Sequence, residues 1–160
     1  MTVQYVLGVD IGATGALAFY TTSEPSLVTV EDMPMVAGRV DPHALARTIR
    51  RVRQLGPAFA VVEQQGPRPT DGCKQSFGIG HAYAVVTTAL ALCEVPVHLV
   101  TSGAWKKHHK IFAADDPKES SRALALRLWP QCADMFALKK HHGRSDAALI
   151  ARFGAETINL

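Results

Sequence analysis

Two acidic residues stand where apolar segments of the chain end. Asp10 follows the β-branched segment 3–9 and precedes a glycine-rich turn, and Glu63 follows the apolar segment 58–62. Both segments are typical of buried strands. A carboxylate at the end of a buried strand is costly unless its charge is compensated, and ligand sites of open α/β sheets gather at strand ends. The pair therefore predicts a divalent-metal site, although a turn aspartate and a surface glutamate are the ordinary alternatives.

A third acid comes from the segment "KKHHGRSDAALIARFG", which predicts a helix over 143–153 with Asp146 near its start. Mg²⁺ prefers octahedral oxygen coordination, so two acids alone would hold it poorly. His142 lies four residues before Asp146 and shares its helix face if the helix begins before Gly143. His141 is a second candidate. The plainer alternatives are compensation of the helix dipole by Asp146 and solvated histidines in a loop.

Carboxylates that share divalent cations indicate two-metal hydrolysis of a phosphodiester. In that chemistry one ion generates hydroxide for in-line attack and the other stabilises the leaving oxygen. A neutral histidine can be a metal ligand or a base toward the attacking water.

The elements that must position these residues follow an α/β pattern. The chain has 160 residues, which fits one domain with a hydrophobic core. Strands are expected over 3–9, 16–22, 27–32, 58–62 and 97–100, with a loop over 33–40. Helices are expected from Asp41-Pro42 to Gly56-Pro57, over 74–94, for one turn over 102–107, from 117 to about 129, and over 143–153. In the long helix we expect Phe77 in the core and close packing at Gly78 and Gly80.

The cysteine content, the absence of a targeting pattern and the charge distribution indicate the cellular compartment and the kind of partner. Three widely spaced cysteines without a CxxC pair (Cys73, Cys93 and Cys132) argue for a reducing compartment and against a zinc site. The sequence contains no signal-peptide pattern and no apolar stretch of membrane-spanning length, so a cytoplasmic protein is expected. The net charge is only +3, but basic residues and histidines cluster over 106–110 and 139–144. Each cluster is interpreted either as a solvated surface or as a surface that contacts phosphates.

An ordered set of motifs resembles the RuvC-type Holliday junction resolvases of the RNase H-like superfamily. The set comprises "VLGVDIGATGALA", "FAVVEQ", "TSGAWKK", "DDPKES" and "HHGRSDAALIA", and it spans nearly the whole chain. The resemblance implies one nuclease domain over 1–160, with a mixed sheet of three antiparallel strands plus parallel strands, flanked by helices. It implies Asp10, Glu63 and Asp146 as metal ligands. The family has an acid or a His about one turn before the last Asp, where this chain has Gly143, so His142 becomes the fourth candidate.

The same resemblance implies a DNA-binding surface around the acids. Lys106 and Lys118 match two family lysines that would neutralise charge near the scissile phosphate, and Lys107 could replace Lys106. An aromatic residue that stacks at the junction centre in the family is absent here, where the Glu is followed by the sequence QQGPR. The expected DNA contacts are Arg68, Lys74, Lys106, Lys107, Lys110, Lys118 and Arg144.

The activity implied is a crossover junction endodeoxyribonuclease that makes paired symmetric nicks. It would use two Mg²⁺ ions per site, with Mn²⁺ as a substitute, and no nucleotide cofactor. Two nicks related by the junction's twofold symmetry imply a homodimer, with the helix over 74–94 as a candidate interface. Three alternatives stay open: an RNase H-like nuclease acting on flaps, forks or RNA/DNA hybrids, a fragment of an actin-like ATPase or kinase, and a noncatalytic DNA-binding module.

Overall fold

A mixed five-stranded sheet forms the centre of the molecule. The computed structural model describes residues 4–56, 58–113 and 115–158. The strand order is β3-β2-β1-β6-β7, with antiparallel pairing from β3 to β1 and parallel pairing from β1 to β7. This confirms the predicted arrangement. The strands are β1 (Tyr5–Asp10), β2 (Ala16–Thr21), β3 (Val28–Asp32), β6 (Ala58–Glu63) and β7 (Val97–Val100).

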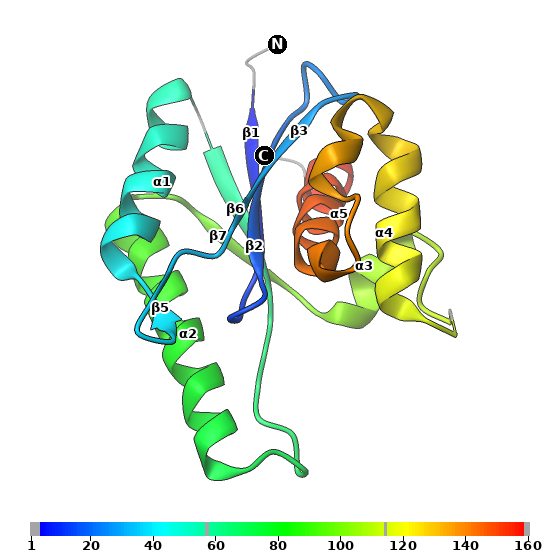
Figure 1. Cartoon of the computed structure of the whole chain (residues 1–160). Coiled ribbons are helices and arrows are strands. Elements are labelled where there is room, and N and C mark those ends of the chain that lie inside the picture. The colour runs from blue at the N-terminus through cyan, green and yellow to red at the C-terminus, as the bar shows by residue number, and fades with distance from the viewer. Residues whose placement is uncertain (1–3, 57, 114, 159–160) are drawn as a thin grey trace.

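Helices cover both faces of this sheet (Figure 1). One face carries α1 (Pro42–Leu55) and α2 (Cys73–Leu92), and the other carries α3 (Ser102–His108), α4 (Pro117–Leu128) and α5 (His142–Thr157). Two short 3₁₀ helices, η1 (Pro130–Met135) and η2 (Lys139–His141), join α4 to α5. No helix among the described residues is both long enough and apolar enough to cross a bilayer.

Side chains along each strand point alternately to the two faces of the sheet, so the molecule has two hydrophobic cores, one on each face. Val6 points into the core shared with α4 and α5, whereas Leu7 and Val9 belong to the core under α1 and α2. Successive strand residues face opposite sides of a sheet, so a continuous apolar strand is what a sheet buried on both faces requires. Val3 and Pro57, which the predicted first strand and first helix end included, lie outside the described residues.

The helix starts follow the predicted capping. Asp41 caps α1 by accepting hydrogen bonds from the backbone N–H groups of His43 and Ala44 at 2.9 and 3.1 Å. Asp116 caps α4 by accepting from the Glu119 N–H at 3.1 Å. Each cap is followed by a proline at the first helical position, where its missing N–H costs nothing.

The segment over 33–40, predicted as a loop, instead forms a small hairpin. Its strands are β4 (Met35–Val36) and β5 (Arg39–Val40). The two turn residues between them, Ala37 and Gly38, have φ of 49° and 75°. Positive φ at both central residues is the geometry that matches the strand twist in tight hairpins. The signal was missed because Ala is an uncommon first residue for such a turn.

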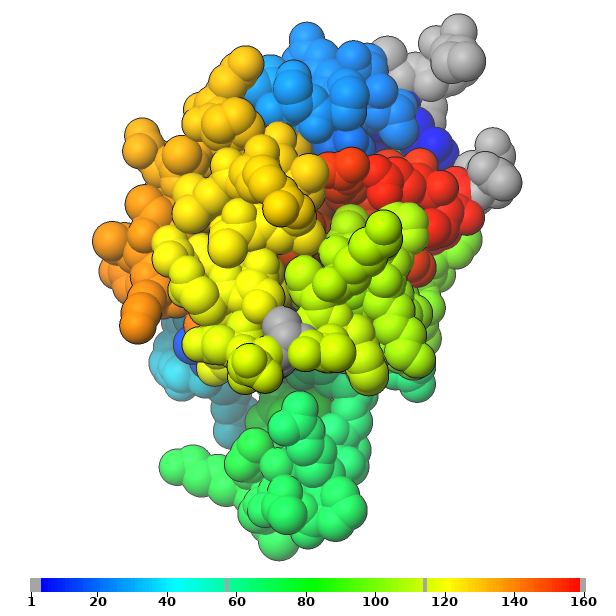
Figure 2. Space-filling view, turned by 90° about the vertical axis from the view of Figure 1, so that its right-hand side faces the viewer, coloured from blue at the N-terminus to red at the C-terminus, as the bar shows by residue number. Residues whose placement is uncertain are grey.

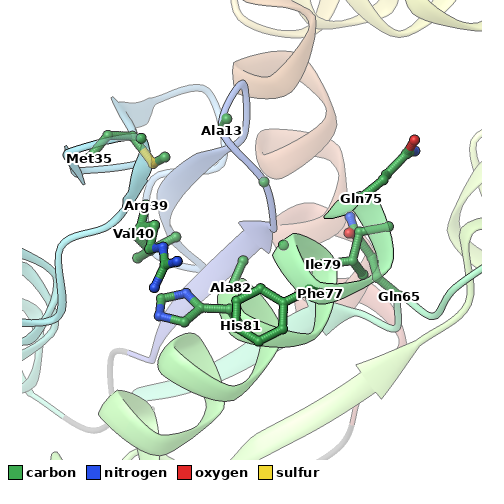
Figure 3. A pocket seen from close by; sticks show the side chains of 13 residues that line it. Ala13, Met35, Arg39, Val40, Gln65, Gln75, Phe77, Ile79, His81 and Ala82 are labelled. Atoms are coloured by element: carbon green, nitrogen blue, oxygen red, sulfur yellow. The ribbon is translucent and has the colours of Figure 1, made fainter. Parts of the chain in front are cut away.

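Helix α2 is less buried than its apolar sequence indicated. Its buried residues begin only at Ala82, and the first two turns extend past the end of the sheet (Figure 1). In Figure 2 this green part of the chain protrudes from the rest of the molecule. The prediction that Phe77 lies in the core is wrong, because its side chain is 64% exposed. Close packing at Gly78 and Gly80 is also wrong, since a Cβ at either position would meet no atom within 4 Å. The reason in each case is that, among the described elements, this part of α2 is contacted only lightly, by the β4–β5 hairpin through Arg39 (Figure 3), and not by the sheet or another helix.

Candidate active site

The parallel pairing of β1 and β6 brings the first two acids to one edge of the sheet. The register pairs Val9 with Val62, the residues that directly precede Asp10 and Glu63. Both strands end there, so both carboxylates emerge at their carboxyl ends. The sequence expectation that distant positions 10 and 63 meet is therefore consistent with the strand order.

Helix α5 packs directly on the backbone of β1 and carries the third acid to the same edge. A Cβ added at Gly8 would lie 2.1 Å from the carbonyl oxygen of Ala147 and 2.5 Å from the backbone nitrogen of Ala151. Only a residue without a side chain permits this approach. Asp146, next to Ala147, is thereby held beside the end of β1.

The start of α5 touches the turn after β1 in the same way. A Cβ at Gly143 would lie 2.0 Å from the carbonyl oxygen of Thr14 and 3.1 Å from the Cα of Gly15. A larger residue has no room there, which accounts physically for glycine at the position where the resemblance would place an acid or a His. Since α5 already begins at His142, His142 and Asp146 are four residues apart on one helix face.

The electrostatics of the three acids reflect their proximity. Burial raises the pKa of Asp10 well above its ordinary value, the negative charges of Asp146 and Glu63 raise it further, and Lys106 partly opposes this. Burial likewise raises the pKa of Asp146 to about 6, with Ser121 and Lys106 lowering it and Glu63 raising it. Buried like charges that disfavour one another are what a cation would relieve.

Asp146 and Ser121 bury polar side-chain atoms beside one another. Asp146 Oδ1 and Ser121 Oγ make no hydrogen bond of ordinary geometry among the described residues, but the Ser121 hydroxyl is close enough to lower the pKa of Asp146. A buried carboxylate oxygen needs a partner, which this hydroxyl or a cation can supply. The donor set of three carboxylates and a histidine suits Mg²⁺ or Mn²⁺. As the side chains stand, however, no three His, Cys, Asp or Glu residues within the described ranges are arranged around a single metal position.

Trp105 supports the site and was not identified from the sequence. Its side chain is fully buried, and its indole N–H donates a hydrogen bond to Glu63 Oε2 at 2.8 Å. The Lys106 ammonium lies 5.1 Å from the centre of the same indole ring, within cation–π range. The sequence feature that could have indicated Trp105 is its position directly before Lys106, a predicted site lysine.

The two predicted site lysines lie near the acids. The charge of Lys106 lowers the pKa of both Asp10 and Asp146, after the larger effects given above. Lys118, in the first turn of α4, also lowers the pKa of Asp146. Lys107 lies differently, with its ammonium 4.9 Å from the centre of the Phe112 ring.

The structure separates the two candidate histidines. Burial lowers the pKa of His142, and the nearby charge of Lys118 lowers it further, so the neutral ring is favoured. His141 is buried, and its Nδ1 accepts a hydrogen bond from the Leu138 backbone N–H at 3.3 Å, which closes η2. His142 lies on the same face of α5 as Asp146. His141 instead accepts a hydrogen bond that holds η2 together.

The predicted DNA contacts fall into two groups. Five of them are exposed, namely Arg68, Lys74, Lys107, Lys110 and Lys118, and Lys106 is half-buried. Of these cations, Lys106 and Lys118 are close enough to Asp146 to lower its pKa. Arg144 differs, because its guanidinium donates to both carboxylate oxygens of Asp32 at 2.6 and 2.7 Å and to the Met135 carbonyl at 3.4 Å. These internal bonds leave Arg144 less available to DNA than the lysines.

Comparison with known proteins supports the fold. No family model matches the chain, and no curated protein matches it. Among solved structures, Thermus thermophilus RuvC in complex with a Holliday junction substrate aligns with a TM-score of 0.59 at 18% identity, over 98% of this chain and 96% of that one. A second structure of Thermus thermophilus RuvC aligns with a TM-score of 0.55 at 17% identity, over 95% of each chain. The chain thus has the fold of these two RuvC structures, with its mixed five-stranded sheet flanked by helices.

Proposed function

We propose that this chain is a metal-dependent, structure-selective endonuclease that resolves four-way DNA junctions by paired, symmetric phosphodiester hydrolysis. The observation that carries the proposal is the meeting of three acids at one sheet edge from β1, β6 and α5, where burial and their mutual repulsion raise the pKa of Asp10 and Asp146. Structural neighbours with RuvC names support the same class. The substrate and the paired cleavage extend beyond the fold.

Four residues would hold the metal: Asp10, Glu63, Asp146 and His142. Divalent cations bound there would supply an activated water and stabilise the leaving 3′-oxygen. The neutral state of His142 leaves a ring nitrogen free to be a ligand or to accept a proton from water. Trp105 keeps Glu63 oriented, because the indole N–H occupies one of its oxygens.

The lysines would bind the scissile phosphate and its neighbours. Lys106 and Lys118 both lie close enough to the acids to shift the pKa of Asp146. Their charges would draw a phosphate toward a site that is otherwise acidic, and they would stabilise the extra negative charge that develops during hydrolysis. Such contacts position a backbone without reading its sequence, so selectivity would come from the shape of the branched DNA.

A homodimer would supply the two active sites that symmetric nicks require. Helix α2 offers the surface, since it is apolar on more than one side and leaves Leu92 75% exposed. A groove of about 300 Å³ runs between α1 and α2 beside Leu92 and is lined by Ala84 and Val85. Sedimentation should give a dimer that Leu92→Glu converts to monomer. A wild-type monomer that still nicks both strands symmetrically would contradict this part.

The decisive experiment is cleavage of a synthetic four-way junction beside a flap, a fork and an RNA/DNA hybrid in Mg²⁺, with Asp10→Asn as the inactive control. Paired nicks confined to the junction are expected. Equal cleavage of flaps or hybrids would replace the junction with another RNase H-like substrate. Absence of cleavage on every substrate in Mg²⁺ and Mn²⁺ would overturn the nuclease assignment. The cytoplasmic location expected from the sequence fits this role and stays a prediction.

A further inference from the structure

Helix α3 is short, and both of its ends are attached to other elements. It has seven residues, and a helix of that length is marginal without tertiary contacts. Near its start, Trp105 is fully buried and donates a hydrogen bond to Glu63 at the end of β6. At its end, His108 and the capping residue His109 contact α5. Lys106 lies between these two attachments, so its position depends on both.

Two histidine hydrogen bonds hold the end of α3. His109 Nε2 lies 2.8 Å from the carbonyl oxygen of Leu149. A carbonyl oxygen can only accept, so Nε2 carries the hydrogen and donates it. Burial lowers the pKa of His109, which favours the neutral ring. His108 makes the second bond, from its Nε2 to Glu156 Oε2 at 2.7 Å.

The acceptor of the second bond is itself fixed within α5. Arg152 Nε donates to the other carboxylate oxygen of Glu156 at 2.7 Å. Burial raises the pKa of Glu156, but the hydrogen bonds from His108 and Arg152 outweigh this effect and lower it. The His108 ring also lies edge-on to Phe153, with ring centres 5.2 Å apart. The carboxylate is therefore ionised, and His108 meets both a charge and a ring on α5.

The contacted residues of α5 lie on the helix face that carries Asp146. Leu149, Phe153 and Glu156 follow Asp146 at successive intervals of three, four and three residues, which is the spacing of one helix face. At the other end of this face, Lys106 is near enough to Asp146 to oppose the rise in pKa that burial causes. Helix α5 thus provides both an acid of the site and the attachment that places the lysine.

We propose that His109 and His108 are positioning residues for Lys106, which hold its ammonium beside the acids by clamping the end of α3 to α5. The inference rests on the proposed nuclease function and deepens it, because it names residues outside the site that determine where a phosphate-binding lysine lies. Displacing a reacting or binding group by about 1 Å can cost roughly 10²-fold in rate. His109 is half-buried and His108 is at the surface, so His109 has the larger share.

The first test follows the position of α3 in EDTA, without DNA. In a Trp129→Phe background, Trp105 is the sole tryptophan of the chain and reports on α3. His109→Leu keeps an apolar side chain but loses the donor. We expect stronger acrylamide quenching and a red shift of Trp105 emission in His109→Leu. His109→Gln should restore both, because its amide can donate to the same carbonyl. Unchanged emission in a folded His109→Leu would overturn the clamp.

A double-mutant cycle tests whether the clamp acts through Lys106. The cleavage rate is measured at saturating Mg²⁺ and saturating four-way junction. His109→Leu should lower it by roughly 10- to 100-fold in the natural chain, and by less than about twofold in Lys106→Ala. Equal losses in both backgrounds would overturn the proposal, since they would mean a general loss of packing. His98→Leu is the matched control, because His98 is half-buried on β7 and lies edge-on to Phe59 with ring centres 5.5 Å apart.

A surface pair of variants covers the case in which His109→Leu does not fold. Glu156→Leu removes the acceptor of the second bond. Arg152→Gln is its control, because the bond of Arg152 to Glu156 lies within α5. We expect Trp105 emission to become more accessible to acrylamide in Glu156→Leu but not in Arg152→Gln. The same emission in both variants would overturn the clamp.

These outcomes separate the clamp from the function. If the wild-type protein cleaves junctions and His109→Leu cleaves them at the same rate, the clamp fails and the nuclease stands. If no substrate is cleaved in Mg²⁺ or Mn²⁺, but His109→Leu exposes Trp105 and His109→Gln restores it, the nuclease fails and the clamp on α3 stands.

Discussion

The indole N–H of Trp105 donates a hydrogen bond to Glu63 at 2.8 Å while the face of the same ring lies 5.1 Å from the Lys106 ammonium. One buried side chain thus contacts an acid and a base of the site at once. An acid whose orientation is fixed by a second residue binds metal more tightly than one left to rotate. The relationship makes Trp105 a positioning residue for Glu63.

Replacing Trp105 by phenylalanine should therefore raise the metal requirement. We expect the Mg²⁺ concentration for half-maximal cleavage to rise by roughly 10- to 100-fold in Trp105→Phe. Titration of cleavage against Mg²⁺ measures this. Trp129→Phe is the control, because Trp129 is equally buried and donates to the Pro25 carbonyl at 3.2 Å, away from the acids. A similar rise in the required Mg²⁺ concentration in both variants would mean that the effect comes from lost packing and not from the hydrogen bond to Glu63.

Asp146→Asn should stabilise the metal-free protein at alkaline pH. The pKa of Asp146 is about 6 in the folded state against an ordinary 3.8, so the folded state holds an extra proton between these values and loses stability as pH rises through them. The gain from Asn should be on the order of 1–3 kcal/mol at pH 8 and vanish near pH 4. Urea unfolding in EDTA at both pH values measures it. A gain that is independent of pH, or one shared by the exposed control Asp134→Asn, would contradict this account.

The two adjacent histidines should give opposite phenotypes. His142→Ala should lower the cleavage rate by roughly 10²-fold or more while the protein stays folded, because a ligand or proton acceptor is lost. His141→Ala should mainly lower the free energy of unfolding, because His141 accepts the Leu138 N–H within η2. Rates under saturating metal and thermal unfolding of both variants distinguish the roles. A larger loss of cleavage rate in a fully folded His141→Ala than in His142→Ala would contradict this assignment of roles and exchange the two histidines.

Glycine substitutions test how α5 is held against β1. Gly8→Ala forces a Cβ into the backbone of α5 and should cost about 1–3 kcal/mol, with loss of cleavage because Asp146 is displaced. Gly80→Ala meets nothing within 4 Å and should add up to about 1 kcal/mol through helix propensity. Denaturant unfolding of both variants measures whether the free energy of unfolding falls in Gly8→Ala and rises in Gly80→Ala. Equal effects at the two positions would exclude the close approach as the cause.

Salt dependence separates DNA contacts from internal ion pairs. Lys107 is exposed, so Lys107→Ala should reduce the slope of log affinity against log salt by roughly 1. Arg144→Ala should leave this slope unchanged and lower the melting temperature instead, because its guanidinium is bonded to Asp32. Junction binding in EDTA at several salt concentrations measures the slope. A reduced slope for Arg144→Ala would restore Arg144 as a phosphate contact.

The sequence was most informative where local signals and strand topology agree. Asp41-Pro42 and Asp116-Pro117 mark helix starts through capping, which depends only on neighbouring residues. The apolar segments before Asp10 and Glu63 form the adjacent strands β1 and β6, and their continuous apolar character is typical of a sheet buried on both faces. The placement of Asp10 and Glu63 at one edge of the sheet could be predicted because it depends on these strand ends, whereas their role as metal ligands stays a prediction.

What the sequence could not supply depends on contacts between distant segments. The apolar run of α2 reads as a buried helix, but whether a neighbour covers Phe77 is decided by the lengths of other elements. The hydrogen bond of Trp105 to a residue 42 positions away has no local signature. The exclusion of any side chain at Gly143 depends likewise on where the turn with Thr14 happens to pass.

The unburied start of α2 has a thermodynamic consequence. Residues 73–80 contribute nothing fully buried to either core, so opening these two turns would expose little apolar surface. Segments of this kind unfold locally at far lower free energy than the core strands. The first two turns of α2 can thus open while β1, β6 and α5 keep Asp10, Glu63 and Asp146 at one sheet edge, so their amide hydrogens should exchange much faster than those of the strands.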